Sequence, residues 1–287
     1  MNYSRELKNQ IFNIIQKESD KLKYPTYVVG GWVRDLLLKR ENTVTDIDFV
    51  CVGSGIILAE KVALTMGKQA RFKVFKKFGT ALISYKGENY EFIGARKESY
   101  RSNSRKPIVE NGTFEDDQIR RDFTINAISI QLNKDNFGEL IDPFNGIEDL
   151  KNKIIKTPGN PNKTYSDDPL RMMRAVRFAT QLHFEIEKES YEAILRNCER
   201  LSIISQERIT EELNKIILSP KPSRGFKVLF ETKLLHQFFP ELVKLEGVER
   251  VGTHVHKDNF YHTIEVLDNI SIHSKNLWLR WAALLHD

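Results

Sequence analysis

The apolar and polar positions in the first half of the chain follow two different periods. Short runs rich in β-branched and aromatic residues predict strands, and runs with apolar residues three or four apart predict helices. The predicted strands cover residues 26–29, 47–52, 71–75, 80–85 and 89–94, and the predicted helices cover residues 4–22, 32–39 and 56–67. Lys86-Gly87-Glu88-Asn89 is typical of a hairpin turn. Residues 1–145 are therefore expected to form a mixed α/β domain.

The strand pattern ends at about Pro143, and helical periods follow. Helices are predicted over residues 167–181, 188–200, 205–218, 223–235, 257–274 and 276–286. A chain of 287 residues is too long for one ordinary core. We divide it into a head at 1–145, a helical neck and body at 146–245, and a further helical region at 246–287. The last helical pattern reaches Asp287 without a capping residue, so we expect the chain to end inside a domain.

Composition narrows the class of protein. Hydrophobic residues make up 40% and charged residues 29%, and no run approaches the roughly 20 apolar residues that cross a bilayer. The N-terminus has no signal-peptide core, and the two cysteines are isolated, which favours a cytoplasmic location. The net charge is +5, and residues 151–177 hold seven Lys or Arg against two Asp. This stretch fits a phosphate-rich partner, and a solvated charged helix is the alternative.

The chemistry is concentrated near residues 30–48. Gly30-Gly31 follows a β-branched run and precedes a helix with Arg34 in its first turn, and Asp46 and Asp48 open the next strand. Side chains two apart on a strand point the same way, so the two carboxylates repel each other unless a cation lies between them. Glycine, a helix start and an arginine suit a polyphosphate. The pattern predicts a site for a divalent metal and a nucleoside triphosphate, and a surface turn is the alternative for the Asp pair alone.

Four ordered motifs extend this pattern. They are Gly30–Asp35, Asp46–Asp48, Arg120–Ala127 and Asp167–Phe178. Their order and spacing resemble the class II tRNA nucleotidyltransferases, which are CCA-adding enzymes, and the related bacterial poly(A) polymerases. The resemblance implies an α+β protein: a polymerase-β-like head with a mixed sheet, an all-α neck and body, and part of a helical HD region.

The resemblance also implies the catalytic residues. Asp46 and Asp48 would bind Mg²⁺ in a two-ion site, where hard oxygen ligands suit the ion. Glu91 would be the third carboxylate, and an outward-facing glutamate paired with a lysine is the alternative. Gly31 and Arg34 match positions that contact the triphosphate, and for Arg34 the alternative is an ion pair with Asp35 or Glu41.

Later motifs imply nucleotide recognition. Arg121 and Asn126 would contact the incoming nucleotide, with Asp122 beside them. Asp168 and Arg171 are predicted to be neighbours three apart on one helix. Their carboxylate and guanidinium would pair with the amino group and ring nitrogen of cytosine or adenine. Two further positions, Arg174 and Arg177, would continue toward phosphates. A ladder of helical salt bridges is the alternative, and Asp167 stands where the family has glutamate.

These features together predict CCA addition to tRNA, with CTP, ATP and Mg²⁺ and no membrane partner. Residues 100–118 resemble the family's flexible loop, which favours CCA or A addition over CC addition. A poly(A) polymerase or an A-adding enzyme is the first alternative. The second is an HD-type metal phosphohydrolase, because five residues of the last region resemble the start of an HD domain: His254, His256, His262, His286 and Asp287. The third is an inert RNA-binding module.

Overall fold

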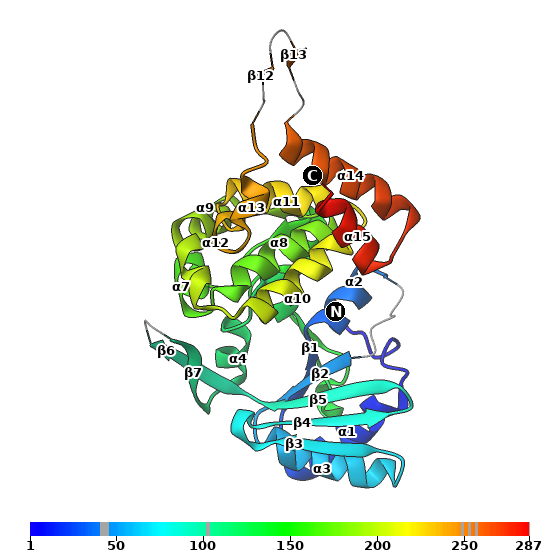
Figure 1. Ribbon diagram of the computed structural model, residues 1–287. Coiled ribbons are helices and arrows are strands. Elements are labelled where there is room, and N and C mark those ends of the chain that lie inside the picture. The colour runs from blue at the N-terminus through cyan, green and yellow to red at the C-terminus, as the bar shows by residue number, and fades with distance from the viewer. Residues whose placement is uncertain (41–45, 102–103, 248–249, 252–253, 256–257, 287) are drawn as a thin grey trace. The chain divides into compact units, whose positions relative to one another are not determined.

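The structure is a computed structural model that describes residues 1–40, 46–101, 104–247, 250–251, 254–255 and 258–286. The chain divides into two compact units (Figure 1). The first comprises Met1–Ser99 and Pro107–Asn152, and the second comprises Tyr100–Lys106 and Lys153–Asp287. The predicted domain limits at residues 145 and 245 stay predictions.

The first unit contains the largest sheet in the described part of the chain. Its seven strands lie in the order β3-β4-β5-β2-β1-β8-β9, and neighbours run antiparallel except β2 and β5, which run parallel. The strands are β1 (Thr26–Val29), β2 (Asp46–Cys51), β3 (Arg71–Phe75), β4 (Thr80–Tyr85), β5 (Glu88–Gly94), β8 (Ser129–Gln131) and β9 (Leu140–Ile141). The α+β class with a mixed sheet is therefore confirmed, and the five predicted strands lie within one residue of their predicted bounds.

One face of this sheet packs against two helices, α1 (Gln10–Leu22) and α3 (Gly55–Met66) (Figure 1). Because side chains alternate along a strand, every second residue of β2 points to this face. Phe49 is buried there, with its ring centroid 5.1 Å from that of Phe92 and 6.0 Å from that of Phe12 on α1. The helix α1 begins at Gln10 rather than at residue 4, since the Asn9 side chain accepts a hydrogen bond from Ile11 N and caps it.

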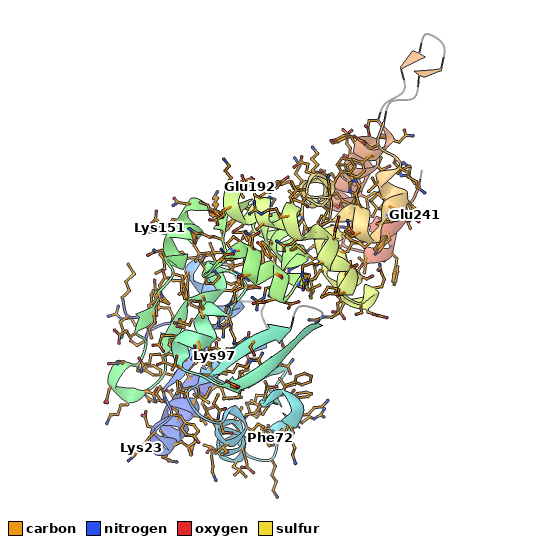
Figure 2. The ribbon with its side chains drawn as sticks, turned by 90° about the vertical axis from the view of Figure 1, so that its left-hand side faces the viewer. Lys23, Phe72, Lys97, Lys151, Glu192 and Glu241 are labelled. Atoms are coloured by element: carbon orange, nitrogen blue, oxygen red, sulfur yellow. The ribbon has the colours of Figure 1, made fainter. Side chains whose placement is uncertain are left out.

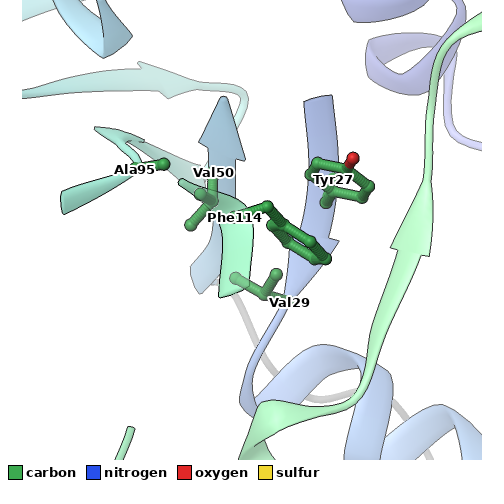
Figure 3. Close-up of a cluster of buried hydrophobic side chains, with 5 residues drawn as sticks. All are labelled: Tyr27, Val29, Val50, Ala95 and Phe114. Carbon is green, nitrogen blue, oxygen red and sulfur yellow. The ribbon is translucent and has the colours of Figure 1, made fainter. Parts of the chain in front are cut away.

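The opposite face carries a second apolar cluster, formed by Tyr27, Val29, Val50, Ala95 and Phe114 (Figure 3). Phe114 begins helix α4 (Phe114–Ile119), and its ring stacks on that of Tyr27 with centroids 3.7 Å apart. Val50 lies two residues after Asp48 on β2, so both point to the same face. The cluster therefore places α4 on the face that carries the two aspartates.

Within residues 100–118, where a flexible loop was predicted, the structure has strand and helix segments. Strands β6 (Arg96–Arg101) and β7 (Ser104–Asn111) pair in a two-stranded sheet, and α4 follows; residues 102–103 lie outside the described residues. These strands lack the apolar alternation by which strands are recognised, so the prediction was wrong. Thr113 and Asp116 form a capping box at the start of α4, and this signal was present in the sequence.

The second unit is mainly helical. Its helices are α7 (Pro161–Asp167), α8 (Leu170–Leu182), α9 (Lys188–Asn197), α10 (Gln206–Ile217), α11 (Pro222–Glu231), α12 (Leu235–Phe238), α13 (Pro240–Val243), α14 (Asn259–His273) and α15 (Leu277–Leu284). Two-residue strands that the sequence did not predict also pair in this unit: β10 (Ile154–Ile155) with β11 (Glu185–Ile186), and β12 (Arg250–Val251) with β13 (His254–Val255). Such short strands show no period that a sequence pattern can reveal.

The remaining elements of the first unit are the short helices α2 (Gly31–Leu37), α5 (Thr124–Ala127) and α6 (Gly146–Asn152). Short 3₁₀ segments lie at Lys76–Phe78, Lys134–Asn136 and, in the second unit, Cys198–Ile203. Exposed Lys23 and Phe72 mark the surface of the first unit, and Phe72 lies on the edge strand β3 (Figure 2). None of the helices that the structure describes is long and apolar enough to span a membrane.

Candidate active site

Three carboxylates lie on one face of the sheet at neighbouring strands. In the parallel pairing of β2 with β5, Asp46 is opposite Asn89 and Asp48 is opposite Glu91. Burial raises the pKa of Glu91, the negative charges of Asp48 and Asp46 raise it further, and Arg96 opposes them. The ionised form of Glu91 is therefore disfavoured by repulsion from Asp48 and Asp46. A bound cation would reduce this repulsion.

Asp46 is held by an amide. Asn89 Nδ2 donates to Asp46 Oδ1 at 2.9 Å, and Ser84 Oγ donates to Asn89 Oδ1 at 2.7 Å. Within the described residues, no three acidic, histidine or cysteine side chains already converge as a metal centre. The donor set nevertheless fits Mg²⁺, because Asp46, Asp48 and Glu91 supply hard oxygens on one face of two adjacent strands. The metal itself stays a prediction.

Gly30 approaches these acids more closely than the sequence indicated. It has φ of +77°, and a Cβ there would lie 3.2 Å from Asp48 Oδ2 and 3.8 Å from Arg121 Nη1. A side chain would therefore be strained and would crowd the carboxylate. The predicted contact residue, Gly31, is the first residue of α2. The Gly-Gly pair thus brings backbone, Asp48 and Arg121 together.

Arg34 is buried in a polar network within the first unit. Its Nε and Nη2 donate to the two carboxylate oxygens of Asp35 at 2.9 and 3.0 Å, and its Nη1 donates to Asn126 Oδ1 at 3.0 Å. Asn126 Nδ2 in turn donates to Asp122 Oδ1 at 3.0 Å. This arrangement includes the ion pair with Asp35 that the sequence left as an alternative. Contacts of Arg34 and Asn126 with a nucleotide stay predictions.

Arg121 is held by Asp117, an acid outside the predicted site residues. Arg121 Nη2 donates to Asp117 Oδ2 at 2.9 Å, and the Asp117 side chain is completely buried. Burial acts to raise the pKa of Asp117, but the guanidiniums of Arg121 and Arg120 outweigh it and hold that pKa below its ordinary value. Arg121 therefore has a fixed anchor on one side, while its Nη1 lies on the side of Gly30 and Asp48.

The second unit places Asp168 and Arg171 at a helix junction rather than on one helix. Asp168 follows α7 in an extended conformation, with φ of −134° and ψ of 95°, and α8 begins at Leu170. Pro169 explains the break, because a residue before proline avoids the helical region. The two residues stay joined locally, since Arg171 N donates to Asp168 O at 3.0 Å. The predicted single helix over 167–181 was therefore wrong at its start.

Arg174 and Arg177 both lie on α8. The guanidinium carbon of Arg174 is 5.3 Å from the ring centroid of Phe178, and that of Arg177 is 4.1 Å away. Arg177 is buried and forms an ion pair with Glu212 of α10, with Nη1 3.1 Å from Oε2. The ion pair of Arg177 therefore links α8 to α10 within the second unit. Contacts of Arg174 and Arg177 with phosphates stay predictions.

The region predicted as an HD domain is described in part. Among its histidines, the rings of His262 and His286 have centroids 5.8 Å apart, and His286 Nδ1 lies 2.9 Å from Ala283 O. The side chain of His254 is not described, and His256 and Asp287 lie outside the described residues. The HD region therefore stays a prediction.

Comparison with known proteins defines the class. Residues 26–156 match the family described as the poly A polymerase head domain, and residues 183–245 match one described as a probable RNA and SrmB-binding site of polymerase A. The chain thus carries a poly A polymerase head domain over residues 26–156, followed by a region similar to the RNA-binding part of polymerase A.

Relatives within this family carry more particular names. The chain is 40% identical over 215 residues to a CCA-adding enzyme of Lactobacillus helveticus, which covers 74% of this chain and 50% of that one. It is 36% identical over 245 residues to an A-adding tRNA nucleotidyltransferase of Geobacter sulfurreducens. The match covers 84% of this chain and 27% of that protein. The chain therefore spans about half, or less, of the length of these relatives.

Solved structures show the same similarity. A tRNA nucleotidyltransferase complexed with a primer tRNA and an incoming ATP analog superposes with a TM-score of 0.73 at 26% identity, covering 94% of this chain and 75% of that chain. A complex of a CCA-adding enzyme with CTP superposes with a TM-score of 0.70 at 30% identity, covering 91% and 55%. The resemblance that the motifs predicted is confirmed.

Proposed function

We propose that this chain carries a template-independent nucleotidyltransferase that adds C, C and A to tRNA 3′ ends from CTP and ATP. The observation that carries the proposal is the register of β2 with β5, which puts Asp48 beside Glu91 on the face where Gly30 leaves room for a ligand. Carboxylates in this arrangement suit nucleotidyl transfer, in which a 3′-hydroxyl attacks the α-phosphate and pyrophosphate leaves.

Asp46 and Asp48 would hold Mg²⁺, with Glu91 beside them, and the bound ion would supply charge neutralisation at the reacting phosphate. Asn89 keeps the Asp46 carboxylate oriented through its 2.9 Å hydrogen bond. Arg121, anchored by Asp117, presents a positive charge near Gly30, where a guanidinium can bind phosphate oxygens. The residues of the first unit thus position the triphosphate, whichever base it carries.

Asp168 and Arg171 would choose the base. A carboxylate accepts a hydrogen bond from the amino group of cytosine or adenine, and a guanidinium donates to the adjacent ring nitrogen. Uracil and guanine present the opposite pattern, so both contacts fail at a cost of about 1–3 kcal/mol each. This selection needs no template strand. Asp168 Oδ1 accepts a hydrogen bond from Leu170 N at 3.3 Å, which holds the carboxylate at the start of α8.

The proposed acceptor is tRNA, and the proposed location is the cytoplasm. One support is the similar structure that contains a primer tRNA. Another is the group of basic residues between positions 151 and 177, at the end of the first unit and the start of the second. These are Lys151, Lys153, Lys156, Lys163, Arg171, Arg174 and Arg177. Phosphate contacts from such side chains would make binding weaken as salt increases.

A-only addition is the second candidate function, because relatives of both kinds match at similar identity. The test offers each triphosphate separately to tRNA lacking its 3′ CCA and to tRNA ending in CC. We expect CTP to be incorporated on the first substrate and a single A on the second. Failure to use CTP with retained A addition would indicate an A-adding enzyme, sustained A addition would indicate a poly(A) polymerase, and no incorporation at all would refute the proposal.

A further inference from the structure

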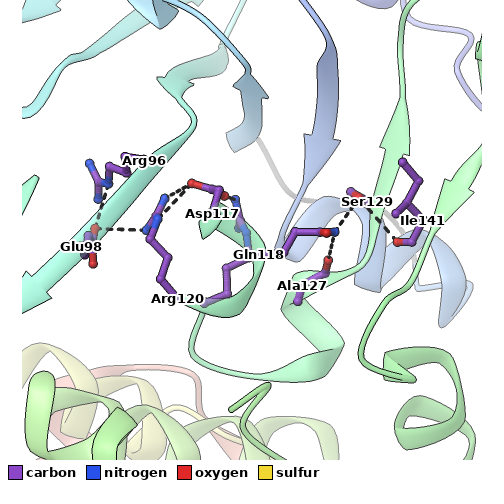
Figure 4. A network of polar contacts seen from close by, with 9 residues as sticks. Arg96, Glu98, Asp117, Gln118, Arg120, Ala127, Ser129 and Ile141 are labelled. Carbon is purple, nitrogen blue, oxygen red and sulfur yellow. Dashed lines mark hydrogen bonds and ion pairs between the residues drawn. The ribbon is translucent and has the colours of Figure 1, made fainter. Parts of the chain in front are cut away.

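A row of charged side chains extends from Arg96 and Glu98 on strand β6 to Arg120 and Asp117 (Figure 4), and Arg121 continues it. Arg96 Nε lies 2.8 Å from Glu98 Oε1, and the same oxygen lies 3.3 Å from Arg120 Nη1. Arg120 also pairs with Asp117, to which its Nε donates at 3.0 Å. Asp117 then accepts from Arg121 Nη2 at 2.9 Å. Five charges of alternating sign therefore lie in succession, all within the first unit.

The two acids in this row are the most enclosed members. The side chain of Glu98 is 3% exposed and that of Asp117 is 0% exposed, while the arginines between and beside them are 14–22% exposed. Buried carboxylates of this kind are costly unless their partners stay in place. The row is therefore expected to keep one geometry, and a shift of Arg120 changes the surroundings of both acids.

Arg120 is the member that both acids share. If Glu98 is neutralised, its attraction for Arg120 weakens, so Arg120 is drawn further toward Asp117 and competes there with Arg121. If Arg120 is removed, Asp117 has Arg121 as its remaining ion-pair partner in the row and draws that guanidinium toward itself. Either change moves Arg121, whose Nη1 is near Gly30 and whose buried Nε has no hydrogen-bond partner among the described residues.

We propose that Arg120 is a positioning residue that sets the orientation of Arg121 through Asp117, and that Glu98 on β6 acts through Arg120. The row thereby joins strand β6 to Arg121, the arginine proposed to contact the triphosphate. This inference rests on the proposed function for the identity of the ligand. The effect concerns phosphate binding, so it is the same for CTP and ATP.

The experiment measures binding of CTP and ATP in Mg²⁺ buffer by calorimetry, with the whole chain. Arg120→Met is expected to raise Kd about tenfold for both nucleotides, and Glu98→Gln about threefold, as expected for losing or weakening one charge-assisted contact. Arg71→Gln, an exposed arginine on edge strand β3, is the matched control and should leave Kd unchanged. Should Arg120→Met fail to fold, Glu98→Gln decides.

A double-mutant cycle separates positioning from general destabilisation. In an Arg121→Met background, Glu98→Gln should have no further effect on Kd, because Glu98 acts through Arg121. In incorporation assays, Glu98→Gln should raise KM for both triphosphates while kcat stays within about twofold. An unchanged Kd in folded Glu98→Gln, or an effect that persists without Arg121, would overturn the inference.

The outcome is distinguishable from failure of the proposed function. Calorimetry reports on nucleotide binding even if the unsubstituted chain incorporates nothing into tRNA. Loss of incorporation with retained binding would refute the proposed reaction and still decide the role of Arg120. Absence of any CTP or ATP binding would overturn the inference itself.

Discussion

The two units hold their polar side chains by different means. In the first unit, Asp48 and Glu91 face the same way because two strands pair in register. In the second unit, Asp168 and Arg171 are placed by a break between helices at Pro169. Under the proposed function, the sheet carries the chemistry common to every nucleotide, and the helix junction carries the choice among nucleotides. Substitutions in the two units should therefore fail in different ways.

The largest effect is expected in the first unit. Asp48→Asn should lower CTP and ATP incorporation by on the order of a thousandfold, since metal ligands supply several kcal/mol of transition-state stabilisation. The thermal midpoint should not fall, because the repulsion between Asp48 and Glu91 is relieved. Single-turnover assays and thermal unfolding check both points. The matched control is Glu60→Gln, an exposed acid on α3, and equal losses in both variants would contradict the assignment.

The second unit offers two Arg–Glu pairs that differ in burial. Arg177 and Glu212 have side chains 8% and 5% exposed, whereas Arg196 and Glu192 are 50% and 49% exposed. Arg177→Met should lower the free energy of unfolding by about 2–3 kcal/mol, because it removes the buried ion-pair partner of Glu212, which keeps its pairing with the more exposed Lys215. Arg196→Met should cost less than about 1 kcal/mol. Urea unfolding measures both, and a stable Arg177→Met protein with weakened nucleotide binding would instead favour the predicted phosphate contact.

The next effect tests base selection. Asp168→Ala should reduce the preference for CTP over UTP by about thirtyfold, since one polar contact with the base is lost. The ratio of the two kcat/KM values is the measurement. Asp48→Asn is the informative comparison, because it should slow every nucleotide without changing the ratio. A ratio unaltered by Asp168→Ala would remove base selection from the helix junction.

The smallest effect depends on pH. The pKa of Asp117 lies below its ordinary value of 3.8, so the ionised form stabilises the folded state. Its contribution is complete above the ordinary pKa and is lost as pH falls through the lowered one. Asp117→Asn should therefore be less stable than the parent by about 1.5 kcal/mol at pH 7, and the difference should shrink below pH 3.8. Unfolding curves from pH 3 to 7 measure it, and a difference that grows in acid would contradict the assignment.

Much of the first unit was predictable because its signals are local. Alternation along β2 placed Asp46 and Asp48 on one face, and the strand bounds followed from short apolar runs. The partner of β2 was not predictable in this way. β5 begins 37 residues after β2 ends, and nothing local states that the two pair in parallel or that Glu91 comes opposite Asp48.

Two further differences had opposite causes. The break before α8 had a visible signal, the proline at Asp168-Pro169. The helix was nevertheless predicted across it, because the apolar spacing continues through this segment. Glu98 had no such signal, because β6 lacks an apolar alternation and was not predicted as a strand, and Asp117 lies on α4, whose capping box does not reveal which arginines it pairs with. Their importance appears only when Arg120 brings them together across 19 residues of chain.

The parallel pairing of β2 with β5 has a consequence for how the head forms. Like charges opposite each other destabilise strand pairing, and closing a chain segment of this length carries an entropic penalty. The aromatic stack of Phe49 on Phe92, on the other face of the same register, favours the pairing. Folding rates should therefore rise when divalent cations are added, because the acidic face is the side that resists assembly.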